Sequence, residues 1–63
     1  GDVWIGDGLV IKDGAALVIR NTGKTVLSGG LVEGGGTLRI DAGEGIEILP
    51  GFEAKAGANV EFK

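Results

Sequence analysis

The sequence predicts an all-β fold, a small right-handed parallel β-solenoid of three triangular coils of about 21 residues each. Three observations support this prediction. No segment keeps apolar residues at helical spacing over three turns without an intervening glycine. Apolar residues instead alternate with period two in short runs that end near glycines. These runs also repeat along the chain, which indicates a single repeat domain over residues 1–63.

The repeat relates the first and last thirds of the chain. Residues 3–19 match residues 46–62 without a gap at an offset of 43, which places Gly8 on Gly51. A middle copy over residues 26–40 fits at an offset near 21, although Leu31 comes one position late in that register. We therefore expect the following coils: residues 1–21, 22–42 and 43–63.

Each coil is expected to hold short strands, marked by apolar pairs spaced two apart. In chain order these pairs are Val3 and Ile5, Leu9 and Ile11, Leu17 and Ile19, Leu38 and Ile40, Ile46 and Ile48, and Val60 and Phe62. Glycine suits the corners between strands, because a corner needs φ values that a Cβ would penalise. Pro50 and Gly51 suit the central positions of a type II turn.

Stacked coils align inward residues into apolar columns, with each strand paired in parallel about 4.8 Å from its equivalent. The predicted core consists of the six pairs above together with Val26 and Phe52. The rival fold is a small antiparallel barrel or meander with RNTGKT, residues 20–25, as a hairpin turn. The two differ in pairing, because a stack pairs Ile19 with Ile40, whereas a barrel pairs it with residues near 26.

The last coil resembles a known family. From Ile46 to Phe62 the chain reads I-x-I-x-P-G-F-x-A-x-x-G-A-x-x-x-F, preceded by GGTLRIDAGEG. This resembles the I-x-L-x-P-G-F-x-A-x-x-G-S-x-F pattern of three-coat-hanger-stack domains, which occur toward the C-termini of secreted and surface proteins of Bacteroidetes. The match covers about residues 34–62. Ala58 stands where the family often has serine. The resemblance implies a three-coil stack with a spacer or accessory role at the cell surface or outside the cell, and no catalytic residues.

Composition excludes several functions. The chain has no Cys and no His, which removes thiolate metal sites, the commonest metal ligand and the commonest general base. The net charge is −3 and the six Lys and Arg residues are scattered singly, which argues against a nucleic-acid partner. No apolar run is long enough for a transmembrane helix. We expect no enzyme activity, no cofactor, no metal and no membrane partner.

Two short motifs suggest chemistry that their surroundings do not support. Gly23-Lys24-Thr25 resembles the end of a phosphate-binding loop, but position 18 holds Val18 where that motif needs glycine, and no helix is expected to follow. Asp7 and Asp13 each precede a glycine, as in calcium-binding β-rolls. They are expected at two different corners, whereas calcium needs converging oxygens. Turn formation explains all of these residues.

Outward positions differ between the first and last coils. Trp4, Val10 and Val18 align with Glu47, Glu53 and Glu61, so the first coil is expected to have an apolar exterior and the last coil an acidic one. The three glutamates are expected on three separate faces, where no acid and base pair can form. The candidate interface for self-association or docking comprises Trp4, Val10, Val18 and Leu27. In the alternative, Trp4 is a lone surface aromatic or covers the open end of the core.

Two functional hypotheses remain open at this point. The first is a structural module without activity, either a spacer domain of a surface protein or an engineered scaffold. The chain also lacks Met, Gln and Tyr and has a single Ser, a narrow composition that suits a designed protein as well as a short natural one. The second is a binding module for carbohydrate or protein that uses an exposed Trp4 face.

Overall fold

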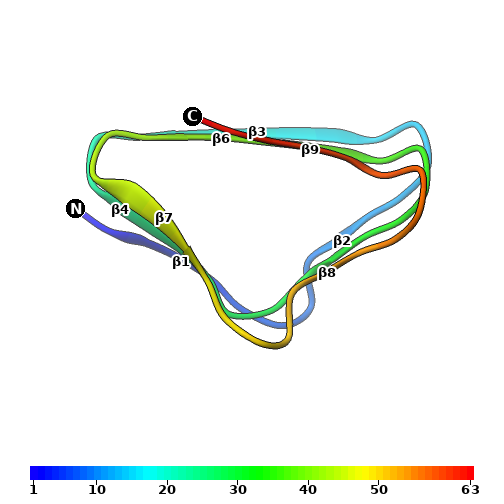
Figure 1. Cartoon of the computed structure of the whole chain (residues 1–63), viewed down its shortest axis with the longest axis horizontal. Coiled ribbons are helices and arrows are strands. Elements are labelled where there is room, and N and C mark those ends of the chain that lie inside the picture. Colours follow the sequence, from blue (N-terminus) through cyan, green and yellow to red (C-terminus); the bar gives the residue numbers. More distant parts are fainter.

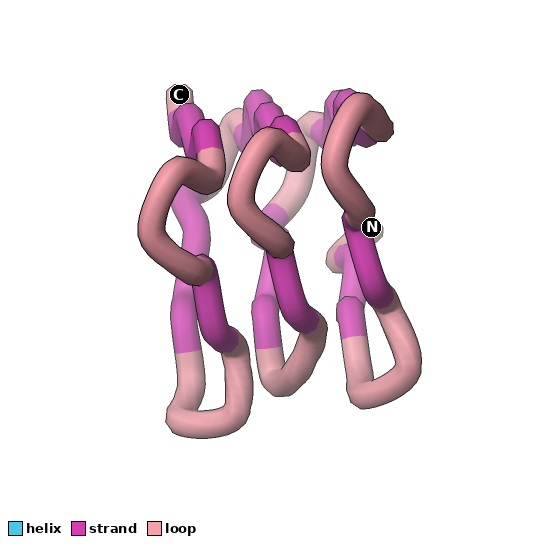
Figure 2. Tube along the Cα trace, turned by 90° about the vertical axis from the view of Figure 1, so that its right-hand side faces the viewer, coloured by secondary structure: helices cyan, strands magenta, loops and turns pink.

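The structure is a stack of three similar coils (Figures 1 and 2). The computed structural model describes all residues from Gly1 to Lys63. Its nine strands are β1 (Val3–Ile5), β2 (Val10–Ile11), β3 (Ala16–Asn21), β4 (Lys24–Leu27), β5 (Leu31–Val32), β6 (Thr37–Ala42), β7 (Gly45–Ile48), β8 (Glu53–Ala54) and β9 (Asn59–Phe62). Three successive strands form each coil. The molecule contains no helix that could span a membrane.

Equivalent strands of the three coils pair into three parallel sheets. The strand orders are β1-β4-β7, β2-β5-β8 and β3-β6-β9, and these sheets form the three sides of a triangular prism (Figure 1). Ile19 pairs with Ile40, and Ile40 pairs with Phe62. This register confirms the parallel stack and rules out the hairpin that the antiparallel alternative requires. The predicted all-β fold of three stacked coils is therefore confirmed.

Glycine makes the sharp corner after the second strand of each coil. Gly14, Gly35 and Gly57 have φ angles of 81°, 83° and 86°. A side chain disfavours this left-handed region, because its Cβ approaches neighbouring backbone atoms. Gly14 donates its N–H to the carbonyl of Gly35, and Gly35 donates to that of Gly57. The corners therefore stack with the same conformation, and each contributes hydrogen bonds to the next coil.

The middle coil supplies most of the core. Its inward side chains Leu27, Val32 and Leu38 are completely buried, and Ile40 is nearly so. Inward side chains of the two outer coils pack against this cluster from both sides and are only partly buried: Ile5, Leu9, Leu17, Ile19, Ile46, Phe52 and Val60. The predicted core residues Ile48 and Phe62 are 48% and 38% exposed, because no fourth coil covers them.

The predicted alignment of the middle coil was wrong in its first strand. Val26, predicted to point inward, pairs with outward-facing Trp4, whereas Thr25 pairs with Val3 and Leu27 pairs with Ile5. In the next strand the predicted offset of 21 holds, because Val32 pairs with the buried Ile11 and Leu31 pairs with the outward-facing Val10. Ser28 to Gly30 form a corner of three residues, one fewer than the equivalent corners of the other coils. A single offset therefore cannot align the strands on both sides of this corner.

Candidate functional site

The predicted interface residues do not form one surface. Trp4, Val10 and Val18 are 67%, 46% and 55% exposed, but they belong to β1, β2 and β3 and so lie on three sides of the prism. Placing Leu27 in this interface was wrong, since its side chain is completely buried in the core. The three exposed residues share the edge of the stack formed by the first coil.

The outer face of the β1-β4-β7 sheet, here the Trp4 face, carries an aromatic residue beside an ion pair. Trp4, Val26 and Glu47 follow one another across its three strands. Val26 is outward in register yet only 6% exposed. Lys24 and Glu47 form a salt bridge on the same face. Trp4 and the ion pair flank Val26, which explains its burial and makes this face amphipathic.

Local hydrogen bonds position Lys24. Asn21 accepts the N–H of Gly23 at 3.3 Å and donates its amide to the carbonyl of Lys24 at 3.0 Å. The backbone N–H of Lys24 donates to a carboxylate oxygen of Asp2 at 3.1 Å. The hydrogen bond that Lys24 donates to Glu47, the negative charge of Glu47 and, to a smaller extent, that of Asp2 raise the pKa of Lys24 above its ordinary value of 10.5, although desolvation opposes this shift. Lys24 is thus held as a cation on the Trp4 face.

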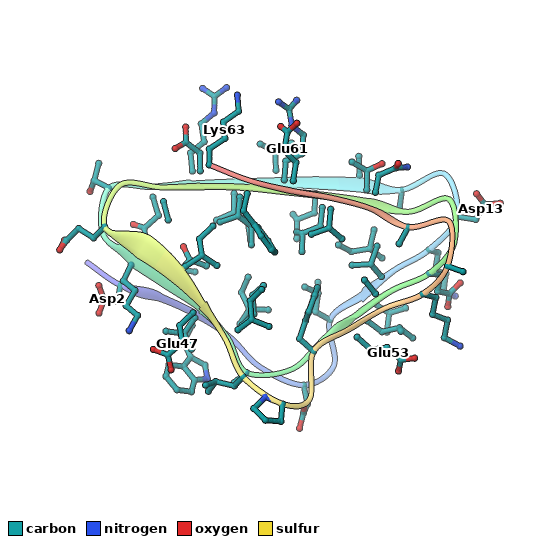
Figure 3. All side chains as sticks on the ribbon, viewed as in Figure 1. Asp2, Asp13, Glu47, Glu53, Glu61 and Lys63 are labelled. Carbon is teal, nitrogen blue, oxygen red and sulfur yellow. The ribbon has the colours of Figure 1, made fainter.

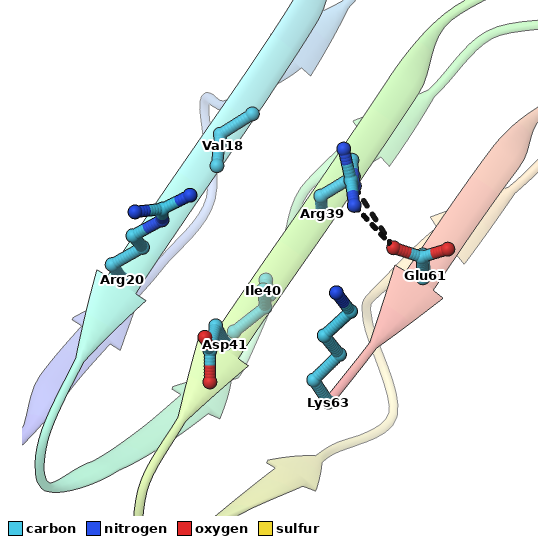
Figure 4. Close-up of a pocket in the computed structure, with 7 residues that line it drawn as sticks. All are labelled: Val18, Arg20, Arg39, Ile40, Asp41, Glu61 and Lys63. Atoms are coloured by element: carbon cyan, nitrogen blue, oxygen red, sulfur yellow. Dashed lines mark hydrogen bonds and ion pairs between the residues drawn. The ribbon is translucent and has the colours of Figure 1, made fainter.

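The outer face of the β3-β6-β9 sheet, here the β3 face, carries three of the six basic side chains, Arg20, Arg39 and Lys63 (Figure 4). Arg39 donates through Nε and Nη2 to the same oxygen of Glu61, at 2.9 and 2.8 Å. A small depression of about 50 Å³ lies on this face, lined by Val18, Arg20, Arg39, Ile40, Asp41, Glu61 and Lys63. Small-molecule sites usually measure about 300–1,000 Å³ and are mostly apolar. This depression is too small and too charged to enclose such a ligand.

A second, wide-open hollow lies at the corner that follows β3 and β6. It measures about 300 Å³ and is lined by Arg20, Asn21, Thr22, Asp41 and Gly43, with no apolar residue among them. Asn21 is already engaged in the turn that positions Lys24. The hollow is open to solvent and has no large apolar side chain in its wall, so it does not enclose a ligand.

In two outward rows of the stack, the charge alternates in sign from coil to coil. Lys12, Glu33 and Lys55 extend the register of the β2-β5-β8 sheet, here the β2 face, and Arg20 pairs with Asp41 on the β3 face. Alternation places opposite charges on neighbouring strands, which is the favourable arrangement. The sequence prediction missed these ladders and both ion pairs. The sequence does contain charged residues of opposite sign about 21 positions apart, but they can be recognised as neighbours only when the strand register is known.

The acidic residues of the last coil are dispersed. Glu47, Glu53 and Glu61 lie on three different sides of the prism, as Figure 3 shows, and their outward direction agrees with the prediction. No three side chains of Asp or Glu come together in a way that could hold a metal ion. These carboxylates therefore act locally, through the ion pairs of Glu47 and Glu61.

One polar atom remains unexplained inside the stack. Thr25 is completely buried on β4, in the inward column between Val3 and Ile46. Its hydroxyl oxygen has no hydrogen-bond partner. An unpaired buried hydroxyl normally costs stability.

The Gly-Lys-Thr motif does not form a phosphate-binding loop. Lys24 points outward and Thr25 points into the core, so their side chains lie on opposite sides of the sheet.

Comparisons with models of known protein families, with curated proteins and with solved structures gave no match.

Proposed function

We propose that this chain is a structural β-solenoid module without catalytic activity, serving as a spacer domain or as an engineered scaffold. The observation that carries the proposal is the separation of its side chains. Aliphatic residues fill the interior, and the charged residues lie on three separate outer faces, several of them paired between coils. Such an arrangement stabilises a stack but assembles no nucleophile with a base and no enclosed ligand site.

An accessory role at the cell surface is the form this proposal takes for a natural chain. It rests on the resemblance of residues 34–62 to three-coat-hanger-stack domains. For a designed chain, the same stack is a scaffold whose outer faces are free for substitution.

The second candidate function is a binding module for carbohydrate that uses the Trp4 face. The specific observation in its favour is the 67% exposure of Trp4 next to the Lys24 and Glu47 ion pair. An exposed indole can stack on the apolar face of a sugar ring, and flanking charges can hydrogen-bond to its hydroxyls. The face offers only one aromatic residue, which makes it a small platform.

Trp4 fluorescence separates the two candidates, because Trp4 is the only tryptophan in the chain. A dilute sample is titrated with a panel of soluble oligosaccharides and polysaccharides while its emission is recorded. The structural proposal expects no saturable change for any member of the panel. A saturable shift, together with retention on a glycan array that Trp4→Ala abolishes, would replace it with the binding module.

A further inference from the structure

The free edge of the first coil, here the N-terminal end, offers unpaired backbone groups beside apolar side chains. The carbonyls of Ile5, Leu9 and Ile11 accept N–H groups from the second coil at 2.8 to 2.9 Å. Alternate residues of a strand direct their backbone groups to opposite sides. The N–H and C=O of Trp4 and Val10 therefore point away from the stack, where no strand of the chain reaches them.

The same holds for β3, the longest strand at this end. The carbonyl of Ala15 accepts the N–H of Thr37 in the second coil at 3.0 Å. By the same alternation Ala16, Val18 and Arg20 direct their backbone groups to the free edge. The three edge strands β1, β2 and β3 thus present unpaired backbone donors and acceptors in the plane of their sheets. Each of these strands also carries one outward apolar side chain, Trp4, Val10 or Val18.

The opposite edge, here the C-terminal end, is protected by charge. Glu47, Glu53 and Glu61 occupy the positions that Trp4, Val10 and Val18 hold at the N-terminal end. Charged residues on edge strands discourage pairing with another chain. At the N-terminal end the equivalent central positions are apolar, so the two ends differ in their capacity to accept a strand.

We propose that a second copy of this chain docks on the N-terminal end, with the two first coils facing each other across a two-fold axis. The axis passes through Val18 in the middle of β3 and through the corner at Asp7, midway between β1 and β2 in the sequence. The rotation reverses strand direction. It places β3 antiparallel to β3 of the partner, and β1 antiparallel to β2 of the partner. Such an interface is isologous, the commonest kind in soluble dimers.

Side chains match across this axis on every strand. Val18 lies opposite the partner's Val18, and Trp4 lies opposite the partner's Val10. Two steps along the strand, Asp2 lies opposite the partner's Lys12, which adds an ion pair on each side of the axis. Trp4, Val10 and Val18 direct their backbone groups toward the partner, so these pairs are of the hydrogen-bonded antiparallel type. The carbonyl of Lys12 already accepts the N–H of Ala15 in the corner, so Lys12 contributes through its side-chain charge.

The core also continues across the contact. Val3 lies opposite the partner's Ile11, and Leu17 lies opposite the partner's Ile19, so inward residues meet inward residues. Leu17 and Ile19 are only partly buried in the single chain and would be covered in this contact. The corner brings Asp7 opposite the partner's Asp7, but the Asp7 carboxylate lies against Gly29 of the middle coil, away from the contact.

Other stacking modes bring like charges together. The same two-fold contact at the C-terminal end would place Glu47 opposite the partner's Glu53, and Glu61 opposite the partner's Glu61. Head-to-tail stacking would place Lys55 beside the partner's Lys12, and Lys63 beside the partner's Arg20. Within the chain, Glu33 and Asp41 separate those cations. Like charges directly opposite each other disfavour both alternatives.

The contact is small. The coil cross-section is a triangle within about 29 × 19 Å, the two longer dimensions of the molecule. Such an end face falls well short of the roughly 800 Å² per partner that a standard interface buries. We therefore expect a reversible dimer with a dissociation constant on the order of 100 µM rather than a permanent one.

Single cysteines distinguish the stacking modes, since the chain has none of its own. Hydrogen-bonded antiparallel pairs place their Cα atoms about 5.5 Å apart, within disulfide range. Under mild oxidation, Val18→Cys should form a disulfide-linked dimer much faster than Glu61→Cys. A faster reaction of Glu61→Cys would instead indicate pairing at the C-terminal end. A mixed disulfide formed preferentially from an equimolar mixture would indicate head-to-tail stacking. Either result overturns the proposal.

Sedimentation velocity from about 10 µM to 1 mM measures the equilibrium itself. The parent should move from monomer to dimer, with a blue shift of Trp4 emission as the partner's Val10 covers the indole. Val18→Glu should weaken association at least about tenfold. Its fold should survive, because Arg39 pairs with Val18 in register and can hold the new carboxylate as it holds Glu61.

Two controls complete the test. Glu61→Gln alters the C-terminal end and should leave the dimer unchanged. Val10→Glu, which copies Glu53 of the last coil, repeats the test on the β2 face should Val18→Glu fail to fold. A parent that stays monomeric at 1 mM, or a dimer insensitive to both glutamate substitutions, would overturn the inference. The structural-module proposal would survive that result, because the ligand titration tests it on dilute protein.

Discussion

Lys24 Nζ lies 2.5 Å from Glu47 Oε1, across the parallel strands β4 and β7. The two residues are not directly opposite in the register, where Lys24 faces Gly45 and Val26 faces Glu47. The Lys24 side chain therefore reaches diagonally across the sheet, beside Val26. Both side chains are nearly half exposed, so the pair is a surface interaction that also helps to shield one apolar residue.

Removal of the Glu47 carboxylate should lower the pKa of Lys24. That pKa lies above 10.5 because of the hydrogen bond and the charge of Glu47. A raised pKa in the folded state means that the stabilisation is complete below pH 10.5 and is lost as the pH rises through the folded-state value. NMR titration of the Lys24 side chain should show a lower pKa in Glu47→Gln, whereas the matched variant Glu53→Gln should leave it unchanged. Equal values in parent and Glu47→Gln would contradict the structure.

Replacement of Thr25 by Val should stabilise the fold by about 1–2 kcal/mol, because it removes a buried hydroxyl without a partner at almost constant volume. Urea denaturation of the two proteins measures the difference. Thr37→Val, at an outward and only partly buried position, serves as the control and should change stability little. Destabilisation by Thr25→Val would mean that the hydroxyl has a partner after all.

Truncation within one inward column should show that the middle coil dominates the core. Ile5, Leu27 and Ile48 align in the β1-β4-β7 sheet, but Leu27 is fully buried and Ile48 is 48% exposed. Leu27→Ala should cost about 3 kcal/mol, and Ile48→Ala about 1 kcal/mol. The free energy of unfolding from chemical denaturation measures both. Similar losses for the two variants would contradict a core centred on the second coil.

Alanine substitutions at two equivalent corner glycines should separate the cost of backbone strain from the cost of steric crowding. Gly14 and Gly35 share a φ angle near 80°, but a Cβ on Gly14 meets open space, whereas one on Gly35 meets the Asp13 carboxylate. Gly14→Ala should cost about 1 kcal/mol from strain alone, and Gly35→Ala should cost more. Thermal unfolding midpoints compare them. The additional destabilisation of Gly35→Ala should disappear when Asp13→Ala is combined with it. If the additional destabilisation persists, crowding against Asp13 is not its cause.

The third strand of each coil was fully predictable from the sequence. Leu17, Leu38 and Val60 align in the structure as predicted, and so do Ile19, Ile40 and Phe62. Glycine corners precede all three strands, and polar residues alternate with apolar ones in β6 and β9. The repeat carries this alternation to β3, where Val18 lies between Leu17 and Ile19. Because side chains of a strand alternate between its two faces, only one choice of the buried face then fits all three strands.

The middle coil was harder to predict because it carries adjacent apolar residues. Either Val26 or Leu27 could be the residue that points inward, and the same is true of Leu31 and Val32. The neighbouring charges hold the missing information. Lys24 faces outward, which requires Val26 to share its face and Leu27 to point inward, and Glu33 fixes Leu31 in the same way. The short corner at Ser28 to Gly30 is invisible to a search with one fixed offset.

The candidate site was less predictable than the fold. Alternation correctly placed Trp4, Val10 and Val18 on the outside, but the grouping of these residues depends on which strand belongs to which side of the triangle. Ion pairs such as Arg39 with Glu61 depend in addition on side-chain rotamers and on the diagonal reach of long side chains. The pattern of apolar and polar residues along the sequence gives neither the side of the triangle to which a strand belongs nor the rotamers of its side chains.

Parallel stacking of three coils is the central claim, because the core, the ladders and the proposed contact all follow from it. The most direct test is a set of nuclear Overhauser effects between isotope-labelled side chains in dilute solution. Contacts are predicted from Ile19 to Ile40 and from Ile40 to Phe62, in register. Contacts of Leu17 and Ile19 with residues 24–27 in antiparallel order, without the Ile19 to Ile40 contact, would contradict the account.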